Sequence, residues 1–348
     1  MNLQFGILGS GSWGTALAKM LTDNGHSINW WIRNAAGIEE FHKRRHNPHY
    51  LSSVHFDMAK LRLSDNVKLV IESSDVLLIA IPSAYAVQTL STLPEDAFRN
   101  KKVLSAIKGI LPDHDLLLND YMAEKFGLDL QDYFAVLGPC HAEEVAAEKL
   151  SYLTFAGKDE SFTSHIASCF RNSYIRTVLN PDIFGVQYAA ILKNIYAVGA
   201  GIAHGLEYGD NFQSVFIANS ADEMANFLRK AGIVNTVVGF LEHGGPEETH
   251  TALNNYTASV YLGDLLVTCY SLYSRNRTFG NMIGKGYSVK SAQLEMNMVA
   301  EGYHASRCMH NINQKVMAEM PIAESIFRIL WEGLNPRQAF ARIEPVLV

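Results

Sequence analysis

The sequence contains few cysteines, and no two of them are close together. Cys140, Cys169, Cys269 and Cys308 are widely separated along the chain. Closely spaced cysteine pairs are typical of zinc sites, and small secreted domains use dense cysteines as a disulfide framework. The cysteine pattern therefore argues against both, and a reducing, cytosolic setting fits it best.

The sequence also lacks a block of like charge. It holds 29 Lys and Arg against 35 Asp and Glu, a formal net charge of −6, with no long basic run. Because nucleic-acid-binding surfaces usually show as a basic cluster, we expect no nucleic-acid partner. An anionic substrate would have to be met by a local cationic pocket.

No apolar stretch is long and pure enough to predict a membrane span. The most apolar long window, residues 186–206, contains Gln187, Lys193, Asn194 and His204, which a span would exclude. The first residues do not show a basic segment followed by an apolar stretch and a small-residue cleavage site. We therefore expect a cytoplasmic protein without a membrane span.

The two halves of the chain follow different patterns, and 348 residues suffice for two domains. Short apolar runs alternate with helical stretches in residues 1–180, which predicts an α/β domain with a doubly wound, mostly parallel sheet. The expected strands are residues 3–8, 27–33, 75–81, 102–107, 133–137, 152–156 and 174–178. After Pro181 apolar residues recur at helical spacing, so residues 181–348 are expected to form an all-α substrate and catalytic domain.

Three glycines in GSGSWG, residues 9–14, follow the first expected strand and open a helical stretch. Gly9 permits the tight turn, Gly11 lets backbone approach a pyrophosphate, and Gly14 allows close packing of helix against strand. The helix N-terminus offers unpaired N–H groups and partial positive charge to the phosphates. The stretch predicts a dinucleotide site in a Rossmann domain.

Arg33 occupies the place, about 20 residues further on, where NAD-binding domains usually have an acidic residue for the ribose hydroxyls. A guanidinium favours a 2′-phosphate at that place. We therefore expect NADPH to be used at least as well as NADH. The alternative is an arginine that only stacks on adenine or faces water.

Two lysines lie in apolar surroundings. Lys108 ends the run VLSAIKGI at the carboxyl end of an expected strand, and Lys193 lies in the apolar helical stretch AAILKNIYAVGAG. Burial disfavours the ammonium form, so we expect lowered pKa values suited to proton donation and acceptance. The alternative for each is a lysine that extends from a helix edge into solvent.

A third polar group lies near residue 270. Asp264 and Thr268 are four residues apart, on one face of an expected helix, and Ser274 to Arg277 follow in a turn-like stretch. The Ser-Arg-Asn-Arg run supplies hydroxyl, amide and guanidinium donors suited to a phosphate, although it is also compatible with a solvated loop.

Together these motifs resemble the NAD(P)-dependent glycerol-3-phosphate dehydrogenases of bacteria. The resemblance covers nearly the whole chain in the family's order and spacing. It rests on GSGSWGTALA, WWIRN, RRHNPHYL, IPS, AIKGI, GPCHAEEVA, LKNIYAVGAGI, GLEYGDN, GDLLVTCYSLYSRNR, VAEGYHAS and MPIAE. It implies a Rossmann domain followed by a helical domain like the C-terminal domain of 6-phosphogluconate dehydrogenase.

The resemblance also implies roles for individual residues. Lys193 matches the proton donor and acceptor, with Lys108, Asp264 and Thr268 beside it. The implied cofactor-binding residues are Gly9, Gly11, Ser12, Trp13, Gly14, Arg33, Lys108, Ala142, Arg275, Val299 and Glu301. The implied substrate-binding residues are Lys108, Gly138, Cys140, Lys193, Asp264, Ser274, Arg275 and Asn276.

The implied reaction interconverts dihydroxyacetone phosphate and sn-glycerol 3-phosphate by hydride transfer with NAD(P)H, which supplies glycerol 3-phosphate for phospholipid synthesis. The resemblance also implies a homodimer. Two alternatives stay open at this point, namely a related β-hydroxyacid or 6-phosphogluconate-type dehydrogenase and a non-catalytic protein that senses NADP(H). The run from Ser274 to Arg277 argues against the first, and the retained lysines argue against the second.

Some positions depart from the family pattern or suggest other chemistry. Cys140, His141, Gln187, Asn219 and residues 258–261 differ from the usual residues, and Gln187 with Asn219 are interpreted as a compensated pair. The histidines of the basic HKRRHNPH stretch have no adjacent carboxylates, so we expect no metal site. Adjacent side chains rarely face each other, so cysteine catalysis at Cys140 and His141 is not expected.

Overall fold

The computed structural model describes residues 3–233, 259–296 and 300–348. The chain forms two compact units. The first comprises Met1–Ile107 and Leu116–Ile183, and the second comprises Lys108–Asp115 and Phe184–Val348. The short segment that carries Lys108 therefore belongs to the second unit, although it lies within the first half of the sequence.

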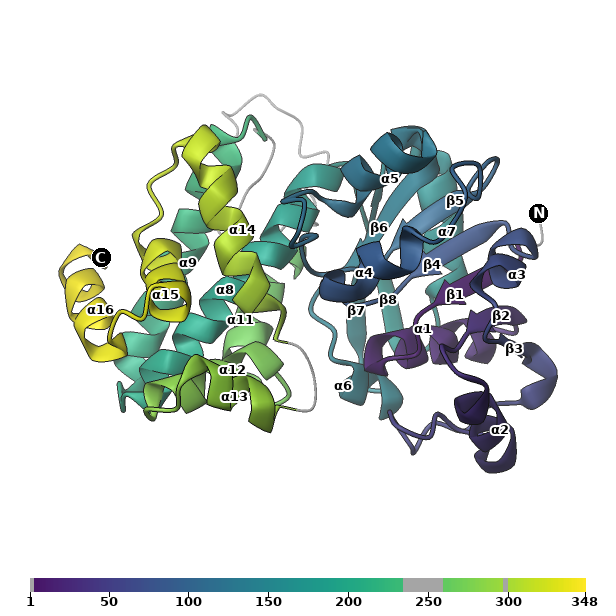
Figure 1. The fold of residues 1–348 in the computed structure, drawn as a ribbon, viewed down its shortest axis with the longest axis horizontal. Helices are drawn as coiled ribbons and strands as arrows, with labels where there is room; N and C mark the ends of the chain where they lie inside the picture. Colours follow the sequence, from purple (N-terminus) through teal and green to yellow (C-terminus); the bar gives the residue numbers. More distant parts are fainter. Residues whose placement is uncertain (1–2, 234–258, 297–299) are drawn as a thin grey trace, which may run out of the picture. The chain divides into compact units, whose positions relative to one another are not determined.

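The first unit is built on one eight-stranded sheet with the order β3-β2-β1-β4-β5-β6-β7-β8 (Figure 1). All neighbouring pairs are parallel except β6 and β7. The strands are β1 Phe5–Leu8, β2 Ile28–Trp31, β3 Leu61–Ser64, β4 Val76–Ile79, β5 Lys102–Ser105, β6 Tyr133–Leu137, β7 Ser151–Gly157 and β8 Ile175–Asn180. This confirms the expected doubly wound, mostly parallel sheet.

The centre of the sheet is the point where the strand order reverses. Ile7 of β1 pairs with Trp30 of β2 on one side and with Leu78 of β4 on the other. In doubly wound sheets, ligands bind outside the carboxyl ends of the strands at such a reversal. The glycine stretch begins at Gly9, directly after β1, and so lies at this position.

Helices cover both faces of the sheet, with α3, α4 and α5 on the face opposite α1 and α7 (Figure 1). The helices of this unit are α1 Ser12–Asp23, α2 Ala35–Arg44, α3 Val67–Glu72, α4 Ser83–Leu90, α5 Leu118–Phe126, α6 Ala142–Ala146 and α7 Glu160–Phe170, with short 3₁₀ turns η1 Met58–Lys60 and η2 Leu130–Asp132.

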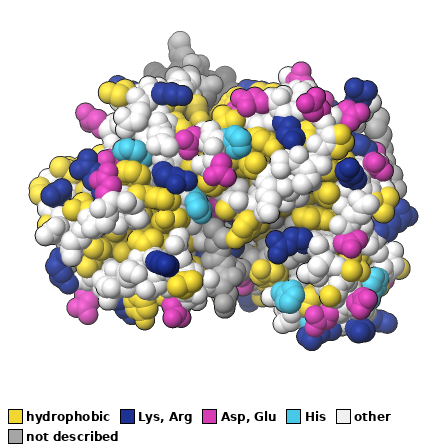
Figure 2. All heavy atoms as spheres, viewed as in Figure 1, with side chains coloured by type: hydrophobic (Ala, Val, Ile, Leu, Met, Phe, Trp, Pro, Cys, Tyr) yellow, Lys and Arg dark blue, Asp and Glu magenta, His cyan; other side chains and the backbone are white. Residues whose placement is uncertain are grey.

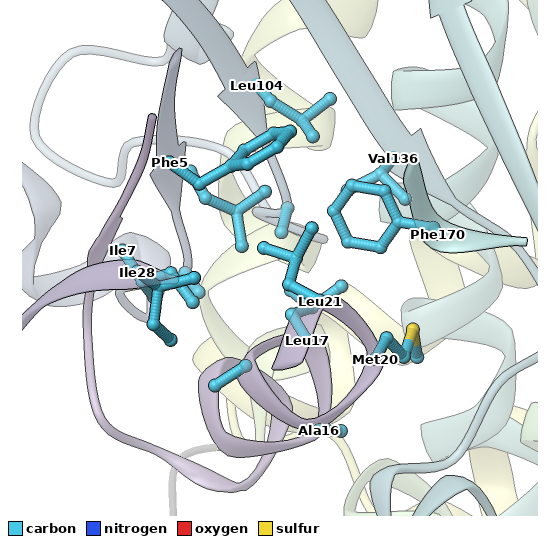
Figure 3. Packing of buried hydrophobic residues seen from close by; sticks show 14 of the residues in the cluster. Phe5, Ile7, Ala16, Leu17, Met20, Leu21, Ile28, Leu104, Val136 and Phe170 are labelled. Atoms are coloured by element: carbon cyan, nitrogen blue, oxygen red, sulfur yellow. The ribbon is translucent and has the colours of Figure 1, made fainter. Parts of the chain in front are cut away.

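The core of the first unit lies between the sheet and the helices α1 and α7. Leu17 and Leu21 of α1 face Phe5 of β1, and Phe170 at the end of α7 closes the cluster (Figure 3). Phe5 and Phe170 meet edge to face, with their ring centroids 6.1 Å apart. This packing fixes α1, and with it the glycine stretch, against the strands.

From Phe184 onward, the described part of the second unit contains helices and the segments that connect them, as expected for residues 181–348, whereas Lys108–Asp115 is irregular. Its elements are α8 Ile183–Gly205, α9 Asp210–Lys230, the π-helical turn η3 Ser259–Gly263, α11 Asp264–Tyr270, α12 Arg275–Gly284, α13 Val289–Glu295, α14 Glu301–Val316, α15 Pro321–Trp331, α16 Pro336–Ile343 and η4 Glu344–Val346. Helix α8 is its longest described element, and it carries Lys193.

Glycines bring α8 and α12 into backbone contact. A Cβ atom on Gly201 of α8 would overlap the carbonyl oxygen of Arg277, and one on Gly280 of α12 would overlap that of Val198. One turn further along, a Cβ on Gly284 would lie 2.9 Å from the Cα of Gly205. The close approach places the start of α12 beside the helix that carries Lys193.

The structure differs from the sequence-based expectation at β3. Leu61–Ser64 pairs with β2 at the edge of the sheet, and no strand was expected there. Only Leu61 of this strand is buried. An exposed edge strand of four residues needs no continuous apolar run, so its sequence does not stand out.

The surface agrees with the balanced composition. Figure 2 shows basic and acidic side chains interspersed on the face drawn there. Within the described ranges, no helix combines the length and the apolar character that crossing a membrane requires.

Candidate functional site

The glycine stretch has the conformation that close contact with a ligand requires. Gly9 has φ +120°, and a Cβ there would lie 2.6 Å from the carbonyl oxygen of Ala80. Gly11 is the N-cap of α1 without a side-chain cap, and a Cβ at Gly11 would meet nothing within 4 Å. A Cβ on Gly14 would overlap the carbonyl oxygen of Gly9. The open space at Gly11 and the uncapped helix N-terminus fit the pyrophosphate of a dinucleotide.

Two side chains hold this stretch from neighbouring segments. Asn47, only 2% exposed, donates from Nδ2 to the carbonyl oxygen of Ser10 at 2.9 Å and to Thr15 Oγ1 at 2.8 Å. Trp30 Nε1 donates to the carbonyl oxygen of Gly9 at 2.9 Å. Sequence reasoning missed Asn47, and its only signal was a small amide within a basic, mostly exposed stretch.

The other expected cofactor residues of the first unit follow strand ends or the glycines. Ser12 is buried and Trp13 is partly buried at the start of α1. Arg33 is exposed, two residues after β2 and directly before Asn34, the N-cap of α2. An exposed guanidinium in this place is able to meet the ribose end of a dinucleotide.

The GPCH turn follows β6 at the same edge of the sheet. Gly138 has φ +126°, and a Cβ there would lie 2.8 Å from the carbonyl oxygen of Tyr152. Cys140 is buried, and its Sγ donates to the same carbonyl oxygen at 3.0 Å. Ala142 begins α6 after His141, an N-cap residue without a side-chain cap. The turn is therefore a fixed feature of the fold, with the thiol bonded to backbone.

Lys193 is the central polar group of the second unit. It is 3% exposed, and its Nζ forms an ion pair with Asp264 Oδ1, which is 1% exposed. Nζ also lies 3.3 Å from Thr268 Oγ1, which donates to the carbonyl oxygen of Asp264 at 2.6 Å. The structure thus brings together three of the four expected catalytic residues, and it confirms the burial expected for Lys193.

Asp264 and a neighbouring thiol complete the surroundings of Lys193. Oδ1 of Asp264 lies in direct contact with Nζ of Lys193. Burial raises the pKa of the neighbouring Cys269 thiol to about 12, so this thiol is neutral at physiological pH. Oδ2 of Asp264 is buried and has no hydrogen-bond partner among the described residues. One carboxylate oxygen is therefore available to a substrate hydroxyl.

A chain of amide hydrogen bonds joins four segments near Lys193. The N–H of Gly302 donates to Asn276 Oδ1 at 2.9 Å, and Asn276 Nδ2 donates to Asn194 Oδ1 at 2.9 Å. Asn194 Nδ2 then donates to the carbonyl oxygen of Lys108 at 2.7 Å. Asn194 follows Lys193 directly, so the same turn of α8 holds both the ammonium and the backbone of Lys108.

Lys108 is less buried than its apolar sequence neighbours suggested. Its side chain is partly exposed, whereas the flanking Ile107 and Gly109 are buried.

Glu301 is the first residue of α14 and precedes Gly302, the first donor of the amide chain. Val299 lies outside the described residues.

The run from Ser274 to Arg277 is a helix start and not the expected turn or loop. Ser274 is the N-cap of α12 and accepts the N–H of Arg277 at 3.3 Å. Arg275 and Asn276 therefore lie in the first turn, where the positive end of the helix dipole favours anions. A serine N-cap before polar residues is a helix-start signal that the turn-like reading overlooked.

Two further sequence observations concern other kinds of site. Within the part of the chain that the structure describes, no group of three or more His, Cys, Asp or Glu side chains could hold a metal ion. His46 and His55 lie edge to face with ring centroids 5.5 Å apart. Asn219 Nδ2 donates to the carbonyl oxygens of Val215 at 2.9 Å and Val348 at 2.8 Å, and the proposed compensation of Asn219 by Gln187 stays a prediction.

The fold and the two groups of residues define a class of protein, the two-unit dehydrogenases that use a nicotinamide dinucleotide. Residues 4–163 match the family model described as NAD-dependent glycerol-3-phosphate dehydrogenase N-terminus. Residues 182–341 match the model described as NAD-dependent glycerol-3-phosphate dehydrogenase C-terminus. The chain therefore belongs to the NAD-dependent glycerol-3-phosphate dehydrogenase family, which confirms the resemblance seen in the sequence.

Individual relatives agree with this assignment. The chain is 33% identical over 96% of its length to glycerol-3-phosphate dehydrogenase [NAD(P)+] of Bacillus thuringiensis, covering 93% of that protein. The crystal structure of glycerol-3-phosphate dehydrogenase from Coxiella burnetii is 28% identical, with a TM-score of 0.86 and 98% of each chain covered. The enzyme from Plasmodium falciparum, 20% identical, shares the fold with a TM-score of 0.82, covering 98% of this chain and 95% of its own. The relative's NAD(P)+ designation agrees with the expected cofactor, NAD(P)H.

Proposed function

We propose that this chain interconverts dihydroxyacetone phosphate and sn-glycerol 3-phosphate with NAD(P)H, and that Lys193 carries the proton. The buried ion pair between Lys193 and Asp264 carries the proposal, because burial of such a pair costs desolvation energy and adds little net stability, whereas it holds an ammonium in one fixed position. The nicotinamide supplies the hydride in reduction and accepts it in oxidation.

The residues around Lys193 divide the chemical work. The ammonium of Lys193 donates a hydrogen bond to the ketone oxygen and then gives up a proton as the alcohol forms. Asp264 orients the ammonium through Oδ1, and its Oδ2 accepts a hydrogen bond from a substrate hydroxyl. Thr268 fixes the position of Nζ, and Lys108 adds a second positive charge for substrate and cofactor.

The start of α12 is proposed to hold the phosphate. Arg275 and Asn276 lie in its first turn, where the helix dipole and the guanidinium both attract an anion. Binding energy from the phosphate then aligns the carbon that reacts, although the phosphate takes no part in the chemistry. Gly138 and Cys140, the remaining substrate residues implied by the sequence, belong to the same proposal.

The dinucleotide is proposed to bind to the glycine stretch of the first unit. Gly9, Gly11 and Gly14 shape the stretch, and Ser12 and Trp13 start the helix that meets the pyrophosphate. Ala142, Arg275, Val299 and Glu301 complete the proposed cofactor set, with Arg33 at the ribose end. The domain boundaries at residues 180 and 181, a homodimer, a cytoplasmic location and a role in phospholipid synthesis extend the proposal from the family resemblance.

The test is the loss of reduced-nicotinamide absorbance when dihydroxyacetone phosphate is added to the purified protein with NADPH or NADH. We expect turnover in the wild type and a decrease in kcat of about 100- to 10,000-fold for Lys193→Met, the usual contribution of a positioned acid or base. The exposed Lys285→Met serves as the control, because it removes an ammonium from the same unit without touching Asp264.

Two results would contradict parts of the proposed function. Binding of NADPH without turnover in the wild type would support a sensor and contradict the proposed reaction. Turnover by Lys193→Met at the rate of Lys285→Met would remove Lys193 from the proton step. Circular dichroism and NADPH fluorescence titration would test whether the variants remain folded and bind cofactor.

A further inference from the structure

The helical segment that carries Asp264 begins with an uncommon turn. Residues Ser259–Gly263 form the π-helical turn η3, which runs directly into α11, Asp264–Tyr270. Gly263 at the junction keeps helical backbone angles, φ −61° and ψ −44°, so the helix continues from one element into the other. Turns of this kind are rare, and they occur frequently at functional sites. This one lies directly before the carboxylate that pairs with Lys193.

Buried residues recur along this segment at every fourth position. The buried pairs are Val260 with Tyr261 in η3, then Asp264 with Leu265 and Thr268 with Cys269 in α11. A regular α-helix has about 3.6 residues per turn, so a step of four residues turns each pair away from the previous one by about 40°. A π turn holds more residues than an α turn, because its hydrogen bonds reach one residue further along the chain. The wider turn therefore lets the pair in η3 and Asp264 face the same side.

The two elements differ in how firmly the core holds them. Val260 and Tyr261 of η3 are both fully buried. In α11 the outer face is open to solvent, with Leu266 39% and Tyr270 45% exposed. Val260 and Tyr261 also lie within residues 258–261, which depart from the family pattern. The direction of the Asp264 side chain thus depends on an anchored turn that is a feature of this chain.

We propose that Val260 and Tyr261 are positioning residues for Asp264, which act through the π-helical turn η3 and hold the carboxylate against Lys193. Their burial fixes the turn, and the turn fixes the first residue of α11. The inference rests on the proposed function for its kinetic readout only, because the contact between Asp264 and Lys193 is also measurable as stability.

The kinetic test is deletion of Leu262, a partly exposed residue of η3. The shortened turn has the residues of a regular α turn, so Asp264 turns away from Lys193 when the buried pair stays in the core. We expect kcat with dihydroxyacetone phosphate to fall by about 10- to 100-fold, as a displacement of about 1 Å from the productive geometry predicts. Leu262→Ala is the matched control, because it removes the same side chain and keeps the turn, and it should have the kcat of the wild type.

A double-mutant cycle with Asp264→Asn separates positioning from a general loss of structure. When the turn acts through Asp264, deletion of Leu262 from the Asp264→Asn variant should lower kcat by less than about 2-fold. A turn with a structural role alone would give the same fold-loss of kcat in both backgrounds.

Urea unfolding provides the same cycle without substrate. Asp264→Asn leaves the ammonium of Lys193 without its buried partner, so it should lower the urea midpoint of the otherwise wild-type protein. In the Leu262 deletion variant the carboxylate has already moved away, and the same substitution should lower the midpoint by less than about half as much. Tyr261→Ala keeps the chain length and carries both cycles when the deletion variant does not fold.

The two readouts distinguish failure of this inference from failure of the proposed reaction. Coupling in the urea cycle, together with a wild type that shows no turnover, would support the positioning of Asp264 and contradict the reaction. Equal effects of Asp264→Asn with and without Leu262 would overturn the inference. A deletion variant with the kcat of Leu262→Ala would overturn it as well, because α11 alone would then hold the carboxylate in place.

Discussion

At the scale of single residues, this protein buries two ionisable side chains, Lys193 and Asp264, in direct contact. Lys193 and Asp264 are both almost completely buried, so each depends on the other. Removing one partner of such a pair leaves an uncompensated charge, which commonly costs about 3–5 kcal/mol. The pair is a costly way to build a stable helical unit and an effective way to hold an ammonium in one orientation.

Arg33 gives a prediction for cofactor choice. We expect Arg33→Glu to lower kcat/KM for NADPH by about 10- to 100-fold, because one charge-assisted bond to the 2′-phosphate contributes about 1.5–3 kcal/mol. The value for NADH should change far less. Arg44→Glu is the control, since Arg44 is exposed on α2 and pairs with Glu40.

Steady-state kinetics with both cofactors provide the measurement. If Arg33→Glu has the same ratio of kcat/KM for NADPH to kcat/KM for NADH as the wild type, the guanidinium faces solvent or stacks on the adenine. The expected preference for NADPH would then lose its basis.

Glu223, a buried carboxylate of α9, gives a prediction for the pH dependence of folding. Burial raises its pKa from 4.5 to about 7 in the folded protein, so the folded chain keeps a proton that the unfolded chain releases. This contribution to stability is fully present below pH 4.5 and is lost as the pH rises through 7. At 1.36 kcal/mol for each pH unit the loss is about 3 kcal/mol.

Urea unfolding of the wild type and Glu223→Gln at several pH values measures this loss. The free energy of unfolding of the wild type, taken relative to Glu223→Gln, should fall by about 3 kcal/mol between pH 4.5 and 7. A constant difference over that range would show that Glu223 titrates in the ordinary range.

Single residues also show what sequence reasoning can reach. The buried position of Lys193 was predictable because its neighbours on the helix are apolar. Asn47 and Glu223 were not, because their partners come from segments far away in the chain, such as Ile322, 99 residues after Glu223. Only the fold reveals which polar groups a buried side chain serves.

At the scale of elements, the crossing of α8 and α12 sets how the start of α12, where we propose that the phosphate binds, lies against the helix that carries Lys193. We expect Gly280→Ala to lower the free energy of unfolding by about 2–3 kcal/mol and to raise KM for dihydroxyacetone phosphate, because the added methyl overlaps the carbonyl oxygen of Val198. Gly209→Ala is the control, since a Cβ at Gly209 would meet nothing within 4 Å.

Thermal unfolding and steady-state kinetics of the two variants check this prediction. Equal stability and equal KM for both would show that the two helices can separate without cost. The role of their glycines would then be limited to local flexibility.

Helices and strands also differ in how clearly their sequences predict them. The central strands were predictable because burial on both faces demands continuous apolar runs. The edge strand β3 was not, since Leu61 is its only buried residue. The start of α12 was read as a turn because the same polar residues, Ser274 to Arg277, suit both a loop and a helix N-terminus.

At the scale of the whole molecule, the two units do not divide the sequence at one point. The segment Lys108–Asp115 belongs to the second unit, where Lys108 accepts from Asn194 and Asp115 accepts from Asn311 at 2.8 Å. We therefore expect a fragment of residues 181–348 to unfold at a lower temperature than the helical unit of the full chain. The fragment lacks those acceptors.

Circular dichroism melting of the fragment, with and without a synthetic peptide of residues 106–117, provides the measurement. The peptide should raise the melting temperature, and a peptide of scrambled order should not. A fragment as stable alone as with the peptide would make the segment a passive connection. Sequence periodicity assigns residues to helices and strands, but it carries no information on which unit a short irregular segment joins.

The amide chain from Gly302 through Asn276 and Asn194 to Lys108 has a consequence for the lifetime of the protein. Each of the two asparagines uses its amide nitrogen and its oxygen at once. Slow hydrolysis of either side chain to aspartate would remove a donor, add a negative charge, and break the connection in one chemical event. Such ageing would leave a folded molecule in which α8, α12 and the segment that carries Lys108 are no longer connected by these hydrogen bonds.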